Sequence, residues 1–535
     1  MNHGLRTKAV LVVDDFQNMR STIKRMLQSI GVDDVDLSAN GRDALGQMAK
    51  RRYDIVFCDY NLGEGPDGQQ VLEEAKHHRL IGVATLFVMI TAENTKEMVM
   101  GAVECRPDDY LTKPFTKDLL KKRLERLLQK KQQFRAIEEA IDGKELQKAI
   151  ALCDAAISVG PRNVNELLRV KAGLLIDVGS LEKAEAICQQ VLAQRSMPWA
   201  HYALARIRYL GKNYPEASDI LEGLLEEHGT HTESYDLLAE CLLRQGMDKE
   251  AQEVLASAVR LSPRAIQRQE ALGKLASKNE DYSTAESAFR RAVGLGHHSV
   301  HRSAEHYTRL AKVQLHSASG REAAKTLKRL RKDFSGDESA MLQAAITESD
   351  VHKESGNEEL AKKSFADAVA LYERIDEALP IEATIEMGKQ FIAFGDKEKG
   401  LALIQDVVRN HHESEEVRAI AQAAFKNTDY EDEGNRLIND AHREVAKLNN
   451  KGVSLFQEGN IDESISLFTK AAEKLPGNCV VNLNAALVML KKLKATGGGD
   501  AAPMGDIRRY LDRVEKIDPK NRTYLELRKA YDSIC

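Results

Sequence analysis

The run Val-Leu-Val-Val-Asp-Asp at residues 10–15 decides the fold of the first part of the chain. It is apolar and rich in β-branched residues, and it ends abruptly in two carboxylates. Residues 55–58 and 86–90 are likewise apolar throughout, and each run is followed by a polar side chain. Continuously apolar runs that alternate with helix-like stretches are typical of strands buried on both faces of a parallel sheet. The alternation therefore predicts a doubly wound α/β domain.

Polar side chains with complementary chemistry follow the ends of these predicted strands. In parallel sheets, ligands bind beyond the carboxyl ends of the strands. Carboxylates that converge there repel one another unless a cation lies between them, and hard oxygen ligands with open positions suit Mg²⁺. One carboxylate can then attack a phosphoryl group, while a hydroxyl and an ammonium hold the phosphoryl oxygens. The residues in these positions, in chain order, are Asp14, Asp15, Asp59, Thr91 and Lys113.

Four strings carry a resemblance to a known family. They are VLVVDD (10–15), DIVFCDYNL (54–62), VMITA (88–92) and DYLTKPF (109–115). Residues 8–130 as a whole resemble the response-regulator receiver domain of bacterial two-component signalling, which implies a CheY-like fold with a parallel five-stranded sheet. The alternative interpretation, unrelated polar loops, would require the same coincidence at several strand ends of one domain.

This resemblance implies specific roles and partners. Asp59 would be the phosphoacceptor for a histidine kinase, with Thr91 and Lys113 as the catalytic switch pair and Tyr110 as the switch aromatic. Mg²⁺ would be held by Asp14, Asp15, Asp59 and the backbone carbonyl of Asn61. A homodimer through the receiver is a further expectation.

Residues 116–141 are predicted to form a helical linker that overlaps the domains on both sides. Thr116 is a good N-cap, and leucines follow it on one helical face. No Gly or Pro occurs from there until Gly143. A continuous helix would transmit rigid-body movement from the receiver to the segment that follows.

The chain then repeats itself. Alanines that begin a second helix recur at spacings of 35, 33, 34 and 34 residues, at Ala149, Ala184, Ala217, Ala251 and Ala285. This period resembles the tetratricopeptide repeat and implies an all-α superhelical solenoid. We predict regular repeats over 133–299, irregular helical repeats over 300–445, and C-terminal repeats with a capping helix over 446–535.

One face of the predicted solenoid carries residues typical of protein interfaces. In the resembled family, the first helix of each unit lines a concave groove. Here that helix presents aromatic and cationic residues, which are frequent binding anchors. The alternative is that they pack between neighbouring repeats. The residues concerned are Trp199, Tyr202, Arg206 and Tyr209, and they predict a protein ligand in the groove.

Composition excludes several functions. The 77 basic and 82 acidic residues give a net charge of −5, so no basic excess is available for nucleic-acid binding. No apolar run approaches the roughly 20 residues of a membrane span, and the seven cysteines are scattered. We therefore expect a cytoplasmic protein without membrane insertion.

The favoured function is a non-enzymatic, phosphorylation-controlled adaptor, because no known catalytic string follows the receiver. One alternative is a phosphate sink or inhibitor of a kinase or rival regulator. Another is an enzymatic or RNA-binding output within the irregular repeats.

Overall fold

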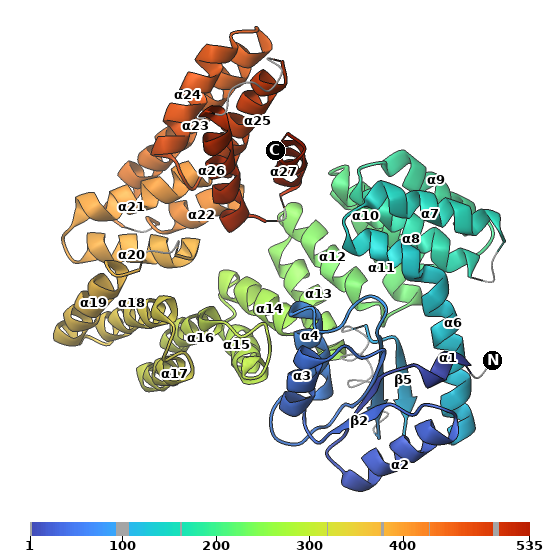
Figure 1. The fold of residues 1–535 in the computed structure, drawn as a ribbon. Helices are drawn as coiled ribbons and strands as arrows, with labels where there is room; N and C mark the ends of the chain where they lie inside the picture. Colours follow the sequence, from blue (N-terminus) through green and yellow to red (C-terminus); the bar gives the residue numbers. More distant parts are fainter. Residues whose placement is uncertain are drawn as a thin grey trace. The chain divides into compact units, whose positions relative to one another are not determined.

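The structure is a computed structural model that describes residues 3–92, 106–160, 163–317, 319–375, 379–426, 428–495, 502–519 and 521–534. The chain forms two compact units, Met1–Thr326 and Leu327–Cys535. The first unit begins with alternating strands and helices and continues with helices alone, and the second is helical (Figure 1). None of the helices described is both long and apolar enough to cross a membrane.

The first unit opens with a five-stranded parallel sheet in the order β2-β1-β3-β4-β5. The order reverses between β1 and β3, which places a topological switch point where these two strands end. The elements of this domain are α1 (His3–Arg6), β1 (Val10–Val13), α2 (Gln17–Ser29), β2 (Val35–Ser38), α3 (Gly41–Lys50), β3 (Ile55–Asp59), α4 (Gly68–His77), β4 (Leu86–Thr91), β5 (Asp109–Thr112) and α6 (Lys117–Asp142).

The sheet lies between two layers of helices because its strands are apolar on both faces. Alternate residues such as Val12 and Phe57 pack against α2 and α6. Their neighbours, such as Val13 and Cys58, pack against α3 and α4 on the other face. The predicted fold class, a doubly wound parallel α/β domain followed by an all-α region, is confirmed.

Helix α6 belongs to both the sheet domain and the helices that follow. It runs for 26 residues, and the side chain of Thr116 caps it by accepting a hydrogen bond from the amide of Leu119. Its first half contributes Leu124 and Leu127 to the core beneath the sheet. Its second half contributes Phe134 and Ile137 to the first helical core. One uninterrupted helix therefore joins the two cores.

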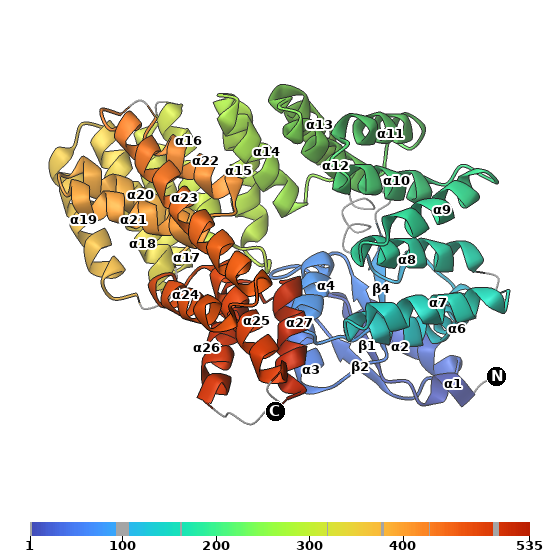
Figure 2. The same cartoon turned by 90° about the horizontal axis from the view of Figure 1, so that it is seen from above.

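Successive helices pair into hairpins along the rest of the chain. In the first unit, α8, α10 and α12 lie beside one another (Figure 2). The helices from α7 to the unit boundary, which falls inside α17, are α7 (Leu146–Ser158), α8 (Val164–Asp177), α9 (Leu181–Leu192), α10 (Pro198–Leu210), α11 (Tyr214–Glu227), α12 (Thr232–Arg244), α13 (Asp248–Leu261), α14 (Ile266–Lys278), α15 (Tyr282–Gly296), α16 (Ala304–His316) and α17 (Gly320–Asp333).

The second unit continues the hairpins. Its α23 is a single helix of 27 residues. It runs across positions 445 and 446, where the sequence predicts the change from irregular to C-terminal repeats. The described helices are α18 (Glu338–Glu354), α19 (Glu358–Tyr372), α20 (Ile381–Ala393), α21 (Lys397–Asn410), α22 (Glu415–Ala423), α23 (Glu431–Gln457), α24 (Ile461–Lys474), α25 (Cys479–Ala495), α26 (Ala502–Ile517) and α27 (Arg522–Asp532).

Small residues let the two helices of a hairpin approach closely. All five alanines of the regular repeat are fully buried. A Cβ added at Gly273 would lie 2.7 Å from the ring of Phe289, and one at Gly452 would lie 2.4 Å from the ring of Phe468. Gly388 and Ile404 make the same kind of contact at 2.7 Å, and each of the three pairs is 16 residues apart. The close contact therefore recurs at one spacing in both units.

Candidate functional site

The ends of all five strands lie at one edge of the sheet, where backbone hydrogen bonds link neighbouring strands. The amide of Asp14 donates to the carbonyl of Ser38 at 3.2 Å, just beyond β1. The amide of Lys113, just beyond β5, donates at 2.8 Å to the carbonyl of Thr91, the last residue of β4. Asp59 is the last residue of β3. The predicted residues therefore share one end of the sheet, as parallel strands require.

Three carboxylates gather where β1 and β3 end. One oxygen from each of Asp14, Asp15 and Asp59 lies within 4.8 Å of the others. Nζ of Lys113 donates to Oδ2 of Asp14 and to Oδ2 of Asp59, at 2.8 Å in both cases. Asp14 and Asp59 are buried, whereas Asp15 is exposed. The cluster therefore reaches solvent through Asp15.

The charges in this cluster perturb one another. Burial raises the pKa of the Asp59 carboxyl, the neighbouring Asp14 acts in the same direction, and the hydrogen bond from Lys113 opposes both. Burial disfavours the ammonium form of Lys113, but its hydrogen bonds to Asp14 and Asp59 outweigh this and raise the pKa of Lys113. Lys113 therefore stays charged and offsets part of the repulsion between the carboxylates.

The donor set fits a hard divalent cation. Its side-chain ligand atoms are carboxylate oxygens, and one carboxylate faces solvent, where bound water can complete the coordination shell. The loop after β3 passes over the cluster, because a Cβ at Gly63 would lie 3.7 Å from Oδ2 of Asp15. Gly63 has a φ of +69°, a conformation that glycine adopts without strain. Asn61 lies exposed in the same loop.

The start of α4 is packed tightly onto Asp59. The amide of Gly68 donates to the carbonyl of Tyr60 at 2.9 Å. A Cβ at Gly68 would lie 2.3 Å from the carbonyl oxygen of Asp59, so only glycine fits. The loop of residues 60–67 is therefore fixed at both ends to the backbone beside Asp59.

Tyr110 lies on β5 opposite Met89 and is half-buried against the α3 and α4 side of the sheet. Arg123 of α6 holds this strand from the other side. Its Nη1 donates to the carbonyl of Tyr110 at 2.8 Å and to the two carboxylate oxygens of Asp109 at 3.0 and 2.9 Å. The strand that carries Tyr110 is thus tied directly to the linker helix.

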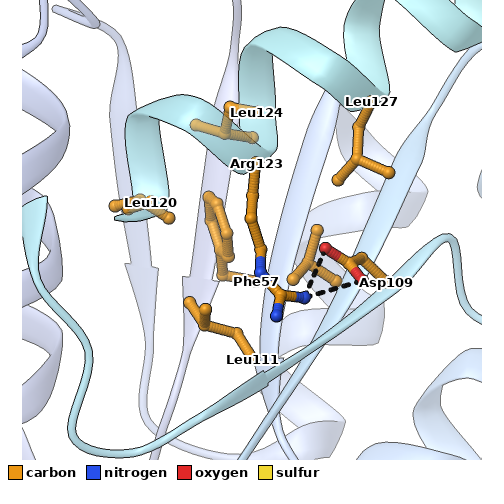
Figure 3. Close-up of a pocket in the computed structure, with 8 residues that line it drawn as sticks. Phe57, Asp109, Leu111, Leu120, Arg123, Leu124 and Leu127 are labelled. Atoms are coloured by element: carbon orange, nitrogen blue, oxygen red, sulfur yellow. Dashed lines mark hydrogen bonds and ion pairs between the residues drawn. The ribbon is translucent and has the colours of Figure 1, made fainter. Parts of the chain in front are cut away.

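The contact between Arg123 and Asp109 lines a small pocket between the sheet and α6, with apolar residues such as Phe57 around it (Figure 3). Sequence reasoning missed this contact because its partners lie on different elements. A signal was present, since Arg123 falls at helical spacing from Leu120 and Leu127, on the apolar face of the linker. A cation on an apolar face indicates a buried partner.

The residues predicted to line the groove contact neighbouring hairpins. Trp199 is half-buried against the helical core formed by α6–α10. The ring of Tyr202 lies 5.3 Å from that of His231. Arg206 pairs with Asp177 of α8 at 3.3 Å, and the hydroxyl of Tyr209 donates to Glu240 of α12 at 2.8 Å. The residues of α10 therefore reach the first helices on both sides.

Comparison with known proteins identifies the family of the first domain. The family described as the response regulator receiver domain matches residues 10–125. The chain is 32% identical over 127 residues to the chemotaxis protein CheY-3 of Vibrio cholerae serotype O1, covering 92% of that protein and 23% of this chain. It is 30% identical over 122 residues to the chemotaxis protein CheY of Pseudomonas aeruginosa, covering 96% of that protein and 23% of this chain.

A solved structure of the chemotaxis response regulator CheY4 of Vibrio cholerae also matches. It is 30% identical, and the match covers all of that structure and 23% of this chain, with a TM-score of 0.21. The sequence relatives match at nearly their full length and within the region that folds as the parallel sheet. Through residues 10–125, the chain therefore belongs to the response-regulator receiver family.

Proposed function

We propose that the chain is a two-component response regulator that is phosphorylated on Asp59 by a histidine kinase. The observation that carries this proposal is the position of Asp59 between Lys113 and the carboxylates of Asp14 and Asp15. Asp59 is the only one of these carboxylates that ends a strand at the centre of the sheet. Asp59 is buried, with 5% of its surface exposed, and its carboxylate would attack the phosphoryl group.

The other residues of the cluster have separate roles in this proposal. Asp14, Asp15, Asp59 and the backbone carbonyl of Asn61 would hold Mg²⁺, which when bound neutralises charge on the phosphoryl oxygens. Lys113 holds one phosphoryl oxygen through its ammonium, and Thr91 holds another through its hydroxyl. Tyr110, on the strand next to Thr91, follows the movement of that hydroxyl. The receiver thereby assists its own phosphorylation and dephosphorylation.

We further propose that the helical region is a tetratricopeptide-type adaptor that binds a protein partner in a phosphorylation-dependent way. Support comes from the buried alanines at a 34-residue period and from the glycine contacts at one spacing. Gly388 and Ile404 extend this hairpin contact into the stretch that sequence reasoning left open to an enzymatic or RNA-binding output. The face of α10 that carries Tyr202 and Tyr209 would contribute to the partner site.

The experiment that tests the proposal is phosphorylation of the full chain with acetyl phosphate and Mg²⁺. We expect an acid-stable, base-labile phosphoprotein, and we expect Asp59→Asn to abolish the label. Asp33→Asn is the matched control, because its side chain is 73% exposed and lies outside the cluster. A label that persists in Asp59→Asn would refute the assignment of Asp59 as the phosphoacceptor.

A further inference from the structure

Three successive connections between hairpins contact the receiver. Each joins the second helix of one hairpin to the first helix of the next, and each contributes one contact: Glu233 at the start of α12, Arg264 between α13 and α14, and Ser299 between α15 and α16. Their separations, 31 and 35 residues, are close to one repeat. Equivalent positions in stacked hairpins lie along one edge of the array. We call these three connections the repeat edge.

Arg264 makes the central contact of the repeat edge. Its guanidinium pairs with Oδ2 of Asp67, and its Cζ lies 5.6 Å from the centre of the Tyr60 ring. The two charged side chains are only 30% and 20% exposed, and Tyr60 is 3% exposed. A planar guanidinium can pair with a carboxylate and stack on an aromatic ring at the same time, so the contact depends on both charge and geometry. This contact is therefore more than an exposed surface ion pair.

Helix α4 makes a second set of contacts one repeat further along. Nε2 of Gln70 donates to the carbonyl of Leu295 at 3.1 Å. The hydroxyl of Ser299 donates to Oε2 of Glu73 at 3.4 Å. Gln70 and Glu73 are three residues apart and share one face of α4. Asp67, the N-cap of α4, contacts Arg264 in the preceding connection. The start of α4 thus contacts two successive connections of the repeat edge.

The third contact leads towards the predicted groove. Arg106 of the receiver pairs with Glu233, whose carboxylate lies 3.8 Å from Nε2 of His231. The His231 ring in turn lies against Tyr202. Arg106 is 74% exposed, so this outer pair contributes little energy by itself. It nevertheless shows that the repeat edge adjoins a residue of the proposed partner site.

The receiver side of this contact is the loop that follows Asp59. Tyr60 is adjacent to Asp59, and its amide donates to the carbonyl of Ile90 at 2.8 Å. Asp67 caps α4 by accepting from the amide of Gln70 at 2.9 Å. The same loop carries Asn61, so a shift of Asn61 towards a bound cation would also move the groups that hold Arg264. A segment that faces a reaction site on one side and an interface on the other can couple the two.

We infer that residues 60–73 of the receiver are docked on the repeat edge through Arg264, and that this dock reports the phosphorylation of Asp59 to the helical hairpins. The inference rests on the proposed function for its phosphorylation step, but the dock itself does not. Because coupling between binding equilibria is reciprocal, loss of the dock should also change how readily Asp59 takes up a phosphoryl group.

The test is hydrogen–deuterium exchange on the full chain, with and without beryllium fluoride and Mg²⁺ as a phosphoryl analogue. The variants are Arg264→Ala and the milder Arg264→Gln, each checked by thermal melting. Arg260→Ala is the matched control, because Arg260 is exposed on the neighbouring α13 and hydrogen-bonds to Ser257 of its own helix. Peptides covering residues 60–77 and 262–302 report the two sides of the dock.

Without the analogue, we expect both Arg264 variants to exchange at least about fivefold faster than wild type in both segments, and Arg260→Ala to match wild type. With the analogue, wild type should change its exchange in 262–302, and the Arg264 variants should not. Unaltered exchange in both Arg264 variants would overturn the dock. An analogue effect on 262–302 that persists in these variants would overturn its role in signalling.

Failure of the proposed function gives a different pattern. If the analogue leaves residues 60–77 of wild type unchanged, Asp59 does not accept a phosphoryl group under these conditions, and the signalling half of the inference fails with it. The comparison without analogue still decides whether the dock exists. If the analogue changes hydrogen exchange in residues 60–77 but not in 262–302, the proposed phosphorylation is supported and the signalling role of the dock is wrong.

Discussion

Lys113 explains how three carboxylates share one corner of the sheet. Its ammonium lies 2.8 Å from an oxygen of Asp14 and 2.8 Å from an oxygen of Asp59, and all three groups are largely buried. Opposite charges at this distance in a poorly solvated site attract strongly, which offsets the cost of burying the carboxylates. Asp15 remains exposed and adds a charge that a cation can neutralise.

Removal of the Asp14 carboxylate tests this balance between repulsion among the carboxylates and their attraction to cations. We expect Asp14→Ala to weaken Mg²⁺ binding at least about tenfold, because one charged oxygen ligand is lost. We expect the variant to stay folded, because Lys113 keeps Asp59 as a partner and one repelling carboxylate is gone. Calorimetric titration with Mg²⁺ and a thermal melt measure the two effects, with Asp33→Ala as the exposed control. Unchanged Mg²⁺ affinity would remove Asp14 from the ligand set.

Sequence was most informative at the scale of single site residues. Asp14, Asp59 and Thr91 were predictable because each follows an apolar run, and parallel strands end at one edge of the sheet. The contact between Arg264 and Asp67 was not predictable, because its partners are 197 residues apart and no local pattern links them. A single sequence contains no signal for such a pair.

At the scale of helices, close approach within each hairpin explains the small residues of the repeat. Ala251 is fully buried where α13 packs against its neighbours. We expect Ala251→Arg to destabilise the array by at least about 3 kcal/mol, through overpacking and an unpaired buried charge. Damage in a linear array spreads to adjacent hairpins. Hydrogen exchange of the full chain should therefore rise in α10–α15 and stay unchanged in β1–β4.

The matched control for this change is Glu253→Arg, two residues along α13, where the side chain is exposed. It introduces the same group without burial and should leave stability within about 0.5 kcal/mol of wild type. Equal melting of the two variants would show that the predicted repeat register is wrong at this hairpin.

Helix α6 offers a second connection between the receiver and the hairpins. Four glycines inserted after Gln129 would interrupt it between Leu127, in the sheet core, and Phe134, in the helical core. Because Arg264 supplies an independent contact, we expect the effect of the phosphoryl analogue on residues 262–302 to survive the insertion. Loss of that effect in the insertion, together with its survival in Arg264→Ala, would assign transmission to α6.

The continuity of α6 illustrates what element-level patterns can and cannot predict. Its leucine spacing and the absence of Gly or Pro indicate a long helix, and Lys117–Asp142 is one helix. No local sequence feature marks the boundary between the two compact units, since that boundary, after Thr326, falls inside α17. The division depends on contacts summed over many residues, which no short motif encodes.

At the scale of the whole molecule, the chain joins a receiver to an array of helical hairpins. Under the proposed function, phosphorylation would change what the hairpins bind. The coupling between phosphorylation and partner binding in such systems is usually about 1–3 kcal/mol, equivalent to about 5–150-fold in affinity. A change of that size is measurable by quantitative capture.

The most direct test of this account compares the proteins retained by the full chain in four states: wild type and Asp59→Asn, each with and without beryllium fluoride and Mg²⁺. We predict that retention of at least one protein from the native lysate changes about fivefold or more with the analogue in wild type. The same protein should not respond in Asp59→Asn. An identical set of retained proteins in all four states would contradict the claim that phosphorylation of Asp59 controls the helical output.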